Sequence, residues 1–110
     1  MLNQAAEKEG LRWGSWADYE KEIVNGRLYA KIGKRYYTEH AVIRMMPRGF
    51  TTQGRSISPA YIEQVIRNGT MSTRTRRDVV RNNYHSGTVE VQTEQEGRII
   101  VSVNPYKVDP

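Results

Sequence analysis

The chain has 110 residues, a length that fits one domain with a single core. Hydrophobic residues make up 37% of it and charged residues 26%, a balance typical of a folded globular domain. It has no cysteine, which excludes disulfides, thiolate catalysis and cysteine-ligated metals, and no apolar run that would suit a membrane span or a secretion signal. We therefore expect a single domain over residues 1–110, with no membrane association, cofactor or metal.

The net charge of +5 is unevenly distributed. Residues 1–26 carry a charge of −2, residues 27–81 carry +9, and residues 82–110 carry −2. A concentrated basic block attracts polyanions and makes their binding depend on salt. The alternative is a solvated basic surface that has no partner.

The first quarter of the chain predicts helices. A polar segment, 3–9, is compatible with a short helix, and a capping-box pattern at Ser15 favours a second helix over 16–24. Asn25 and Gly26 supply a stop for that helix. The aromatic side chains nearby favour a role as core anchors over one as base-stacking platforms; they are Trp13, Trp16 and Tyr19.

The next segment, "RLYAKIG" (27–33), alternates apolar and polar residues, which suggests a short strand or a continuation of the helix. Thr38 is then a plausible N-cap for a helix that Pro47 and Gly49 end. A further helix is predicted over Pro59–Asn68, because Ser58 fits the N-cap and proline fits the first helical position.

The last third of the chain predicts strands after a basic connector, "TMSTRTRRD" (70–78). Three segments with strand patterns follow: 79–85, 88–94 and 98–103. The expected fold is α+β, with helices first in the chain and packed on one face of a C-terminal antiparallel meander.

The two histidines suggest chemistry on RNA. Cleavage of RNA without a metal needs a base for the 2′-hydroxyl, an acid for the leaving oxygen and cations for the charge on phosphorus. On a helix, His40 and Arg44 share one face, and a first-turn position lowers the pKa of a histidine. The alternative is a surface histidine held by hydrogen bonds.

His85 ends the segment "VVRNNYH", in which Arg81, Asn83 and His85 point to one side. Such a polar row is either an exposed edge or the floor of a cleft. The arginines of the basic block are expected to bind substrate phosphates; they are Arg55, Arg74, Arg76, Arg77 and Arg81.

Three motifs between residues 36 and 105 belong together. They are "EHAVIRMMPRGF", with His-Ala followed one turn later by Arg-Met, "SISPAYIEQVIRNGT", and "YHSGTVEVQTEQEGRIIVSVNP". Together they resemble the C-terminal nuclease domains of bacterial polymorphic toxins, especially those of contact-dependent growth inhibition systems. The link between the two helices is longer than the family's usual tight turn, and it carries Arg48 and Arg55.

The resemblance implies a barnase/EndoU/colicin/RelE-like fold, in which N-terminal helices pack on a twisted antiparallel sheet whose concave face holds the active site. It divides the chain into an N-terminal helical segment, 1–35, and a catalytic core, 36–110. By position, His40 matches the helix histidine of the family and Arg44 the arginine that follows it. Further polar groups of the family's sheet correspond to His85, Tyr84 and Thr88.

The resemblance also implies a metal-independent ribonuclease, often directed at transfer RNA, that leaves a 2′,3′-cyclic phosphate. Its partners would be RNA, a cognate immunity protein and a host factor. It would form part of a secreted or cell-surface bacterial effector and act in the cytoplasm of the target cell. Two alternatives remain open from the residues: a non-catalytic RNA-binding module, and a toxin of similar fold that attacks DNA or a nucleotide cofactor.

Overall fold

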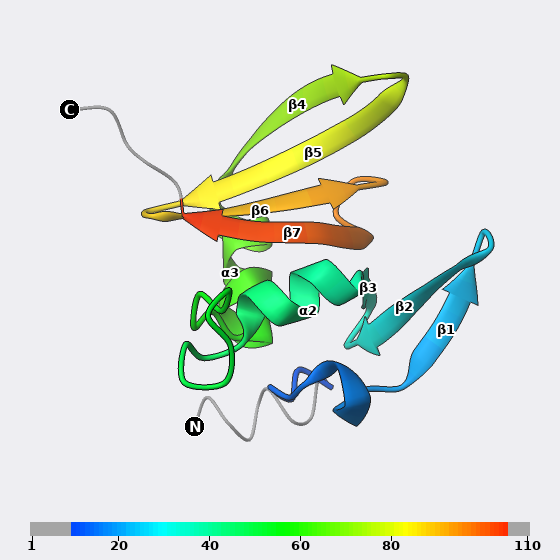
Figure 1. Ribbon diagram of the computed structural model, residues 1–110. Helices are drawn as coiled ribbons and strands as arrows, with labels where there is room; N and C mark the ends of the chain where they lie inside the picture. The colour runs from blue at the N-terminus through cyan, green and yellow to red at the C-terminus, as the bar shows by residue number, and fades with distance from the viewer. Residues whose placement is uncertain (1–9, 106–110) are drawn as a thin grey trace.

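Seven strands and two α-helices make up residues 10–105, the part of the chain that the computed structural model describes (Figure 1). The sheet has the strand order β1-β2-β3-β7-β6-β5-β4. The strands are β1 (Lys21–Val24), β2 (Arg27–Ile32), β3 (Arg35–Tyr37), β4 (Thr70–Arg76), β5 (Val79–Ser86), β6 (Val89–Glu94) and β7 (Ile99–Pro105). The helices are α2 (Glu39–Met45) and α3 (Pro59–Asn68).

The α+β class is confirmed, and an antiparallel meander of β5, β6 and β7 follows the two helices as predicted. The expectations that the chain begins with helices and that the whole sheet is antiparallel are wrong. Three strands precede α2, and β3 pairs with β7 in the parallel direction, so the sheet is mixed. The chain returns to the middle of the sheet with its last strand. β7 lies between β3, which comes early in the chain, and β6.

The helix predicted over 16–24 is also wrong. Only Trp16–Asp18 is helical, as a short 3-10 turn, and Asp18 accepts a hydrogen bond of 2.8 Å from the backbone N–H of Ser15 in the predicted capping box. Asn25 and Gly26 have φ angles of 52° and 81°, the left-handed pair that a two-residue hairpin turn needs. They therefore join β1 to β2 rather than end a helix, and the described part of segment 1–35 contains a β-hairpin instead of that helix. The helix suggested for 3–9 lies outside the described residues.

The basic connector predicted at 70–78 is a strand, β4, and the turn that follows it. β4 pairs with β5 along its full length, although all seven of its residues are exposed. Arg77 and Asp78 have φ angles of 51° and 65° and form the tight turn. An edge strand exposed throughout has no alternation of apolar residues, which is why its sequence does not look like a strand.

The two predicted helices are confirmed together with their caps. Thr38 accepts a hydrogen bond of 3.0 Å from the backbone N–H of Ala41, and its hydroxyl donates to the carbonyl of Val101 on β7 at 2.9 Å. Ser58 accepts a hydrogen bond of 3.2 Å from the backbone N–H of Tyr61. The hydrogen bond from the hydroxyl of Thr38 to the carbonyl of Val101 therefore fixes the first turn of α2 beside β7.

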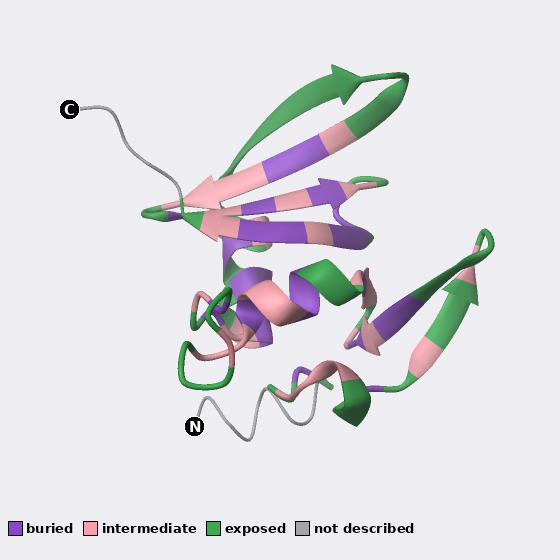
Figure 2. Ribbon diagram, in the orientation of Figure 1, coloured by how far each residue is buried: buried purple, intermediate pink, exposed green. Residues whose placement is uncertain are grey.

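The core lies between the helices and one face of the sheet, as the buried segments in Figure 2 show. Ala41, Val42 and Met45 of α2 and Ile62 and Val65 of α3 are its helical members. The strands contribute further buried side chains, which on β6 alternate with partly exposed ones; they include Ile32, Tyr37, Val91, Ile100 and Val103.

A buried ion pair ties α3 to β3. The guanidinium of Arg35 forms a bidentate contact with the carboxylate of Glu63, with 3.1 Å between Nη2 and Oε2, and its Nη1 donates to the carbonyl of Gly97 at 2.8 Å. Glu63 is only 7% exposed, so its charge depends on this partner.

The N-terminal aromatic residues differ in how far they are buried. Tyr19 is 8% exposed and belongs to the core, as predicted, and Trp16 packs partly against it. Trp13 is 41% exposed, so its predicted role as a core anchor is wrong. Its ring stands at the surface instead.

Candidate nucleic-acid interface

The side of β4–β7 that faces away from α3 carries rows of mainly polar side chains, and we call this side the open face. Successive residues of a strand point to opposite faces, so the cross-strand register fixes which side chains share a row. The first row is Thr70, His85, Glu90 and Asn104. The second row is Ser72, Asn83, Gln92 and Ser102. The third row is Arg74, Arg81, Glu94 and Ile99.

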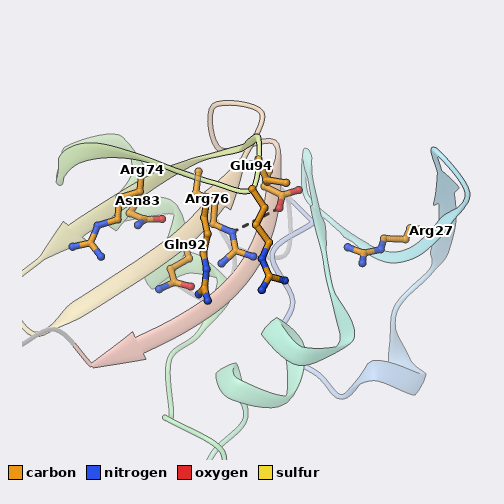
Figure 3. A pocket seen from close by; sticks show the side chains of 9 residues that line it. Arg27, Arg74, Arg76, Asn83, Gln92 and Glu94 are labelled. Carbon is orange, nitrogen blue, oxygen red and sulfur yellow. Dashed lines mark ion pairs between the residues drawn. The ribbon is translucent and has the colours of Figure 1, made fainter.

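The open face is hollowed into a pocket of about 510 Å³, which we call the arginine pocket (Figure 3). Its lining residues are Arg27, Arg74, Arg76, Arg77, Val79, Arg81, Asn83, Gln92 and Glu94. Five arginines face one carboxylate, so the pocket has a strong excess of positive charge. Four of the five arginines predicted to bind substrate are therefore brought together here, and the polar row of β5 is the floor of a pocket.

Arg27 reaches the arginine pocket from β2, across from the side chains of β4–β6 (Figure 3). In the strand order, β3, β7 and β6 lie between β2 and β5. A side chain from β2 can line a pocket with residues of β5 only because the sheet curves strongly. The open face is therefore concave, a shape that suits a chain of phosphates.

Two amide side chains stand opposite each other on the floor of the pocket. Asn83 is only 5% exposed, and its Oδ1 atom is buried without a hydrogen-bond partner in the described structure. Gln92, its register partner, donates from Nε2 to Glu90 at 3.2 Å. An unsatisfied buried carbonyl costs about 1–3 kcal/mol, so this amide is a costly feature of the pocket floor.

His85 lies in the first row of the open face, half-buried, with Thr70 and Glu90 as its register partners. Side chains directly opposite each other on neighbouring strands have Cβ atoms about 4.5–5.5 Å apart. Glu90 and His85 are therefore cross-strand neighbours on the open face, two rows from the third-row arginines.

His40 and Arg44 lie one turn apart on α2, as predicted. Partial burial lowers the pKa of His40 below its ordinary value of 6.5, and the positive charge of Arg44 lowers it further. The imidazole is therefore neutral at pH 7 and able to accept a proton. The Nε atom of Arg44 is buried and has no hydrogen-bond partner within the described residues.

The remaining predicted residues lie elsewhere. Tyr84 points to the opposite side of β5 from His85 and packs against the core, with its hydroxyl beside Gly97. Thr88 is in the turn before β6 and not in a strand. It lines a second pocket together with Arg55. The structure thus separates these three residues from the open face.

Glu90, Gln92 and Arg27 were not among the predicted site residues. The reason differs between the two residues of β6, Glu90 and Gln92, and Arg27 of β2. The alternation in "VEVQTE" places Glu90 and Gln92 on one face, but the same pattern is typical of any strand with one solvated face. No local pattern marks Arg27, because its place in the pocket depends on the curvature of the whole sheet.

The described residues were also compared with the requirements of a metal site and of a membrane-spanning helix. Among residues 10–105, no group of three histidine, aspartate or glutamate side chains is placed to hold a metal ion. No helix in that range is long and apolar enough to cross a membrane.

Comparison with known proteins found no match. The chain matches no protein-family model, no curated protein and no solved structure at a significant level. The chemistry of the open face and of α2 is therefore the basis for assigning a function.

Proposed function

We propose that this protein is a toxin ribonuclease that holds RNA on the open face and cleaves it without a metal, with transfer RNA as the expected substrate. The arginine pocket is the observation that carries the proposal, because it combines five arginines with two amides on a concave sheet. Arginines bind phosphates and amides bind base edges, which are the two parts of an RNA chain. The resemblance of residues 36–105 to toxin nuclease domains supports the same substrate.

The proposed reaction is a transphosphorylation. The base removes the proton of a ribose 2′-hydroxyl, the 2′-oxygen bonds to phosphorus, and the bond from phosphorus to the 5′-oxygen breaks. The acid protonates the leaving 5′-oxygen, so the products are a 2′,3′-cyclic phosphate and a 5′-hydroxyl. Charge and atoms balance without any further reactant.

We assign His40 as the base and His85 as the acid. The assignment requires that the RNA chain pass from the open face round the sheet to α2, because α2 packs on the core side and His85 points away from it. The lowered pKa of His40 keeps its imidazole neutral at pH 7, as a base requires. Glu90 stands opposite His85 and orients its ring, as a carboxylate does in other acid–base sites. Arg44, with its unpartnered Nε, stabilises the charge that develops on the phosphoryl oxygens.

The test is to incubate the protein with total cellular RNA in excess EDTA and to analyse the ends of the products. Discrete fragments with 2′,3′-cyclic phosphate ends are expected. RNA that stays intact while it binds tightly would overturn cleavage and favour the non-catalytic RNA-binding alternative. Cleavage of DNA or of a nucleotide cofactor instead of RNA would favour the other alternative.

Two single variants test the assigned residues. His40→Ala and His85→Ala should each lower cleavage at least about a hundredfold, the usual contribution of a positioned acid or base. RNA affinity should change much less, because the arginine pocket is intact in both. Gln64→Ala, an exposed change on α3, is the matched control that should cleave like the wild type. Wild-type cleavage by either histidine variant would overturn that assignment.

The proposed setting is competition between bacteria, in which the protein is part of a secreted or cell-surface effector that acts in the cytoplasm of the target cell. An immunity protein with an acidic surface that covers the open face is the expected partner, because five arginines attract such a surface. Expression of the chain alone should stop growth, and co-expression of its immunity protein should restore it. Growth arrest by the His40→Ala variant would overturn the link between toxicity and cleavage.

A further inference from the structure

A second pocket, of about 400 Å³, opens where the loop between α2 and α3 meets the start of β6, and we call it the aromatic pocket. Its lining residues are Trp13, Arg48, Arg55, Ser56, Ile57, Ser58, Tyr61, Thr88, Val89 and Pro105. The volume lies in the range of small-molecule sites. None of these residues is acidic, and two are arginines, so the pocket favours an anion.

Two aromatic rings that line this pocket are exposed to solvent and do not belong to the core. Trp13 is 41% exposed and Tyr61 is 42% exposed. Neither ring stacks on another ring or receives a cation within the described residues. Exposed faces of indole and phenol rings in a shared pocket are typical platforms for planar ligands, above all nucleobases.

The arginines of the pocket are held in place by the backbone of their loop. The backbone N–H of Arg55 donates to the carbonyl of Arg44 at 2.7 Å, and that of Arg48 donates to the hydroxyl of Ser56 at 3.2 Å. The Nε atom of Arg55 is buried and has no hydrogen-bond partner in the described structure. The two hydrogen bonds hold the backbone of the loop, and the guanidinium groups that it carries can donate to phosphate oxygens.

The aromatic pocket is separate from the arginine pocket. It includes Thr88 and Val89 at the start of β6, whereas the arginine pocket includes Glu94 at the end of that strand. Six residues of a strand span about 20 Å. Val89 also belongs to the core-facing side of the sheet, so the two pockets open on different faces.

We propose that the aromatic pocket is a nucleotide-binding site in which the base stacks on Trp13 and Tyr61 and the phosphate bonds to Arg48 and Arg55. The nucleotide is either free or part of an RNA chain, and both sources present the same base and phosphate. The proposal rests on the residues that line the aromatic pocket, and it does not depend on RNA cleavage at the open face.

The test uses AMP as the probe and the fluorescence of Trp13 as the signal. The chain has two tryptophans, so a Trp16→Phe background leaves Trp13 as the single reporter. Trp16 lies outside the pocket, where it packs at the edge of the core with Lys21 over its ring, and phenylalanine keeps an aromatic ring there. AMP should quench this fluorescence in a saturable way. Adenosine and inorganic phosphate, which each offer half of the ligand, should bind at least about tenfold more weakly.

Matched variants locate the site. Tyr61→Ala and Arg55→Gln should each weaken AMP binding about tenfold. Phe50→Ala removes an exposed aromatic ring that lines neither pocket, and Arg74→Gln with Arg76→Gln changes the arginine pocket; both should bind AMP like the background. Absence of quenching, or equal losses in the Phe50 variant, would overturn the proposal, as would loss only in the arginine-pocket variant.

Two comparisons separate the sources of the ligand and the two proposals. A short RNA that quenches Trp13 far below the AMP concentration would identify RNA as the source, and AMP as the tighter probe would identify a free nucleotide. AMP binding without RNA cleavage would leave this site standing and overturn the ribonuclease. RNA cleavage by the Trp16→Phe background without saturable quenching by AMP would do the reverse.

Discussion

Arg81 on β5 and Glu94 on β6 form an ion pair, with 3.8 Å between Nε and Oε2, inside the arginine pocket. Glu94 is the single acidic residue among the nine that line this pocket. Its carboxylate occupies the guanidinium that a phosphate would otherwise contact and reduces the positive field. The pair therefore limits how strongly the open face binds an anion.

Replacement of Glu94 by glutamine should strengthen RNA binding. The change frees Arg81 and raises the charge of the pocket by one, so affinity at low salt should rise several-fold and the dependence on salt should become steeper. Stability should change by less than about 1 kcal/mol, because the pair is partly exposed. Fluorescence anisotropy with labelled RNA over a salt series measures both effects. Glu22→Gln, exposed on β1, is the control, and an equal gain there would indicate a general charge effect.

Replacement of Arg76 by alanine should weaken RNA binding and lower the salt dependence. One lost phosphate contact reduces the slope of log K against log salt by about 0.7 for a single strand. Arg98→Ala removes the same charge at an exposed site outside the pocket, with its guanidinium over the ring of Tyr36, and should leave the slope near that of the wild type. Equal slopes for the two variants would contradict a specific role for the pocket.

The pKa of His40 predicts a change of stability with pH. Because this pKa is lower in the folded state than its ordinary value of 6.5, the unfolded chain takes up the proton first as the pH falls. The free energy of unfolding should therefore decrease as the pH falls from about 6.5 through the folded pKa. Urea unfolding between pH 5 and pH 8 should show a smaller decrease for His40→Gln than for the wild type. The difference should be small because the side chain is mostly exposed, and identical curves would contradict it.

The buried pair of Arg35 and Glu63 should be important for stability. Glu63→Gln leaves the guanidinium without its charged partner, and such losses cost about 3 kcal/mol. Arg67 also contacts Glu63, at 3.6 Å, but its side chain is 59% exposed. Arg67→Gln is therefore the matched control, with an expected cost below about 1 kcal/mol. Denaturant unfolding measures both values, and similar costs would contradict the difference in burial.

Local signals explain which parts of the fold the sequence predicts. The helix Pro59–Asn68 has an N-cap, a proline at the first position and an apolar stripe, and all three are encoded within a few residues. Asn25 and Gly26 illustrate the opposite case, since the same pair can end a helix or turn a hairpin. Pairing of β1 with β2 selects the hairpin turn over the helix end, and no pattern within a few residues of the turn predicts that pairing.

The candidate site was predictable to the extent that charge and alternation define it. The basic block identified Arg74, Arg76 and Arg81, and alternation on β5 placed His85 with Arg81. The opposite orientation of Tyr84 follows from the same alternation, although the family resemblance had grouped it with His85. The arrival of Arg27 in the pocket depends on the curvature of seven strands, which no single segment contains.

The position of β7 between β3 and β6 also has a consequence for folding. The backbone N–H of Thr38 donates to the carbonyl of Ile100 at 3.0 Å, and that of Tyr36 donates to the carbonyl of Arg98 at 2.9 Å. These contacts join segments about sixty residues apart, so their formation requires closure of a long loop, which slows folding. Until residues 98–105 have been synthesised, β3 lacks its pairing with β7, and α2 lacks the strand to which the hydroxyl of Thr38 donates. A ribosome-bound chain would therefore be inactive until this strand has emerged, which delays the appearance of any activity that the folded domain has.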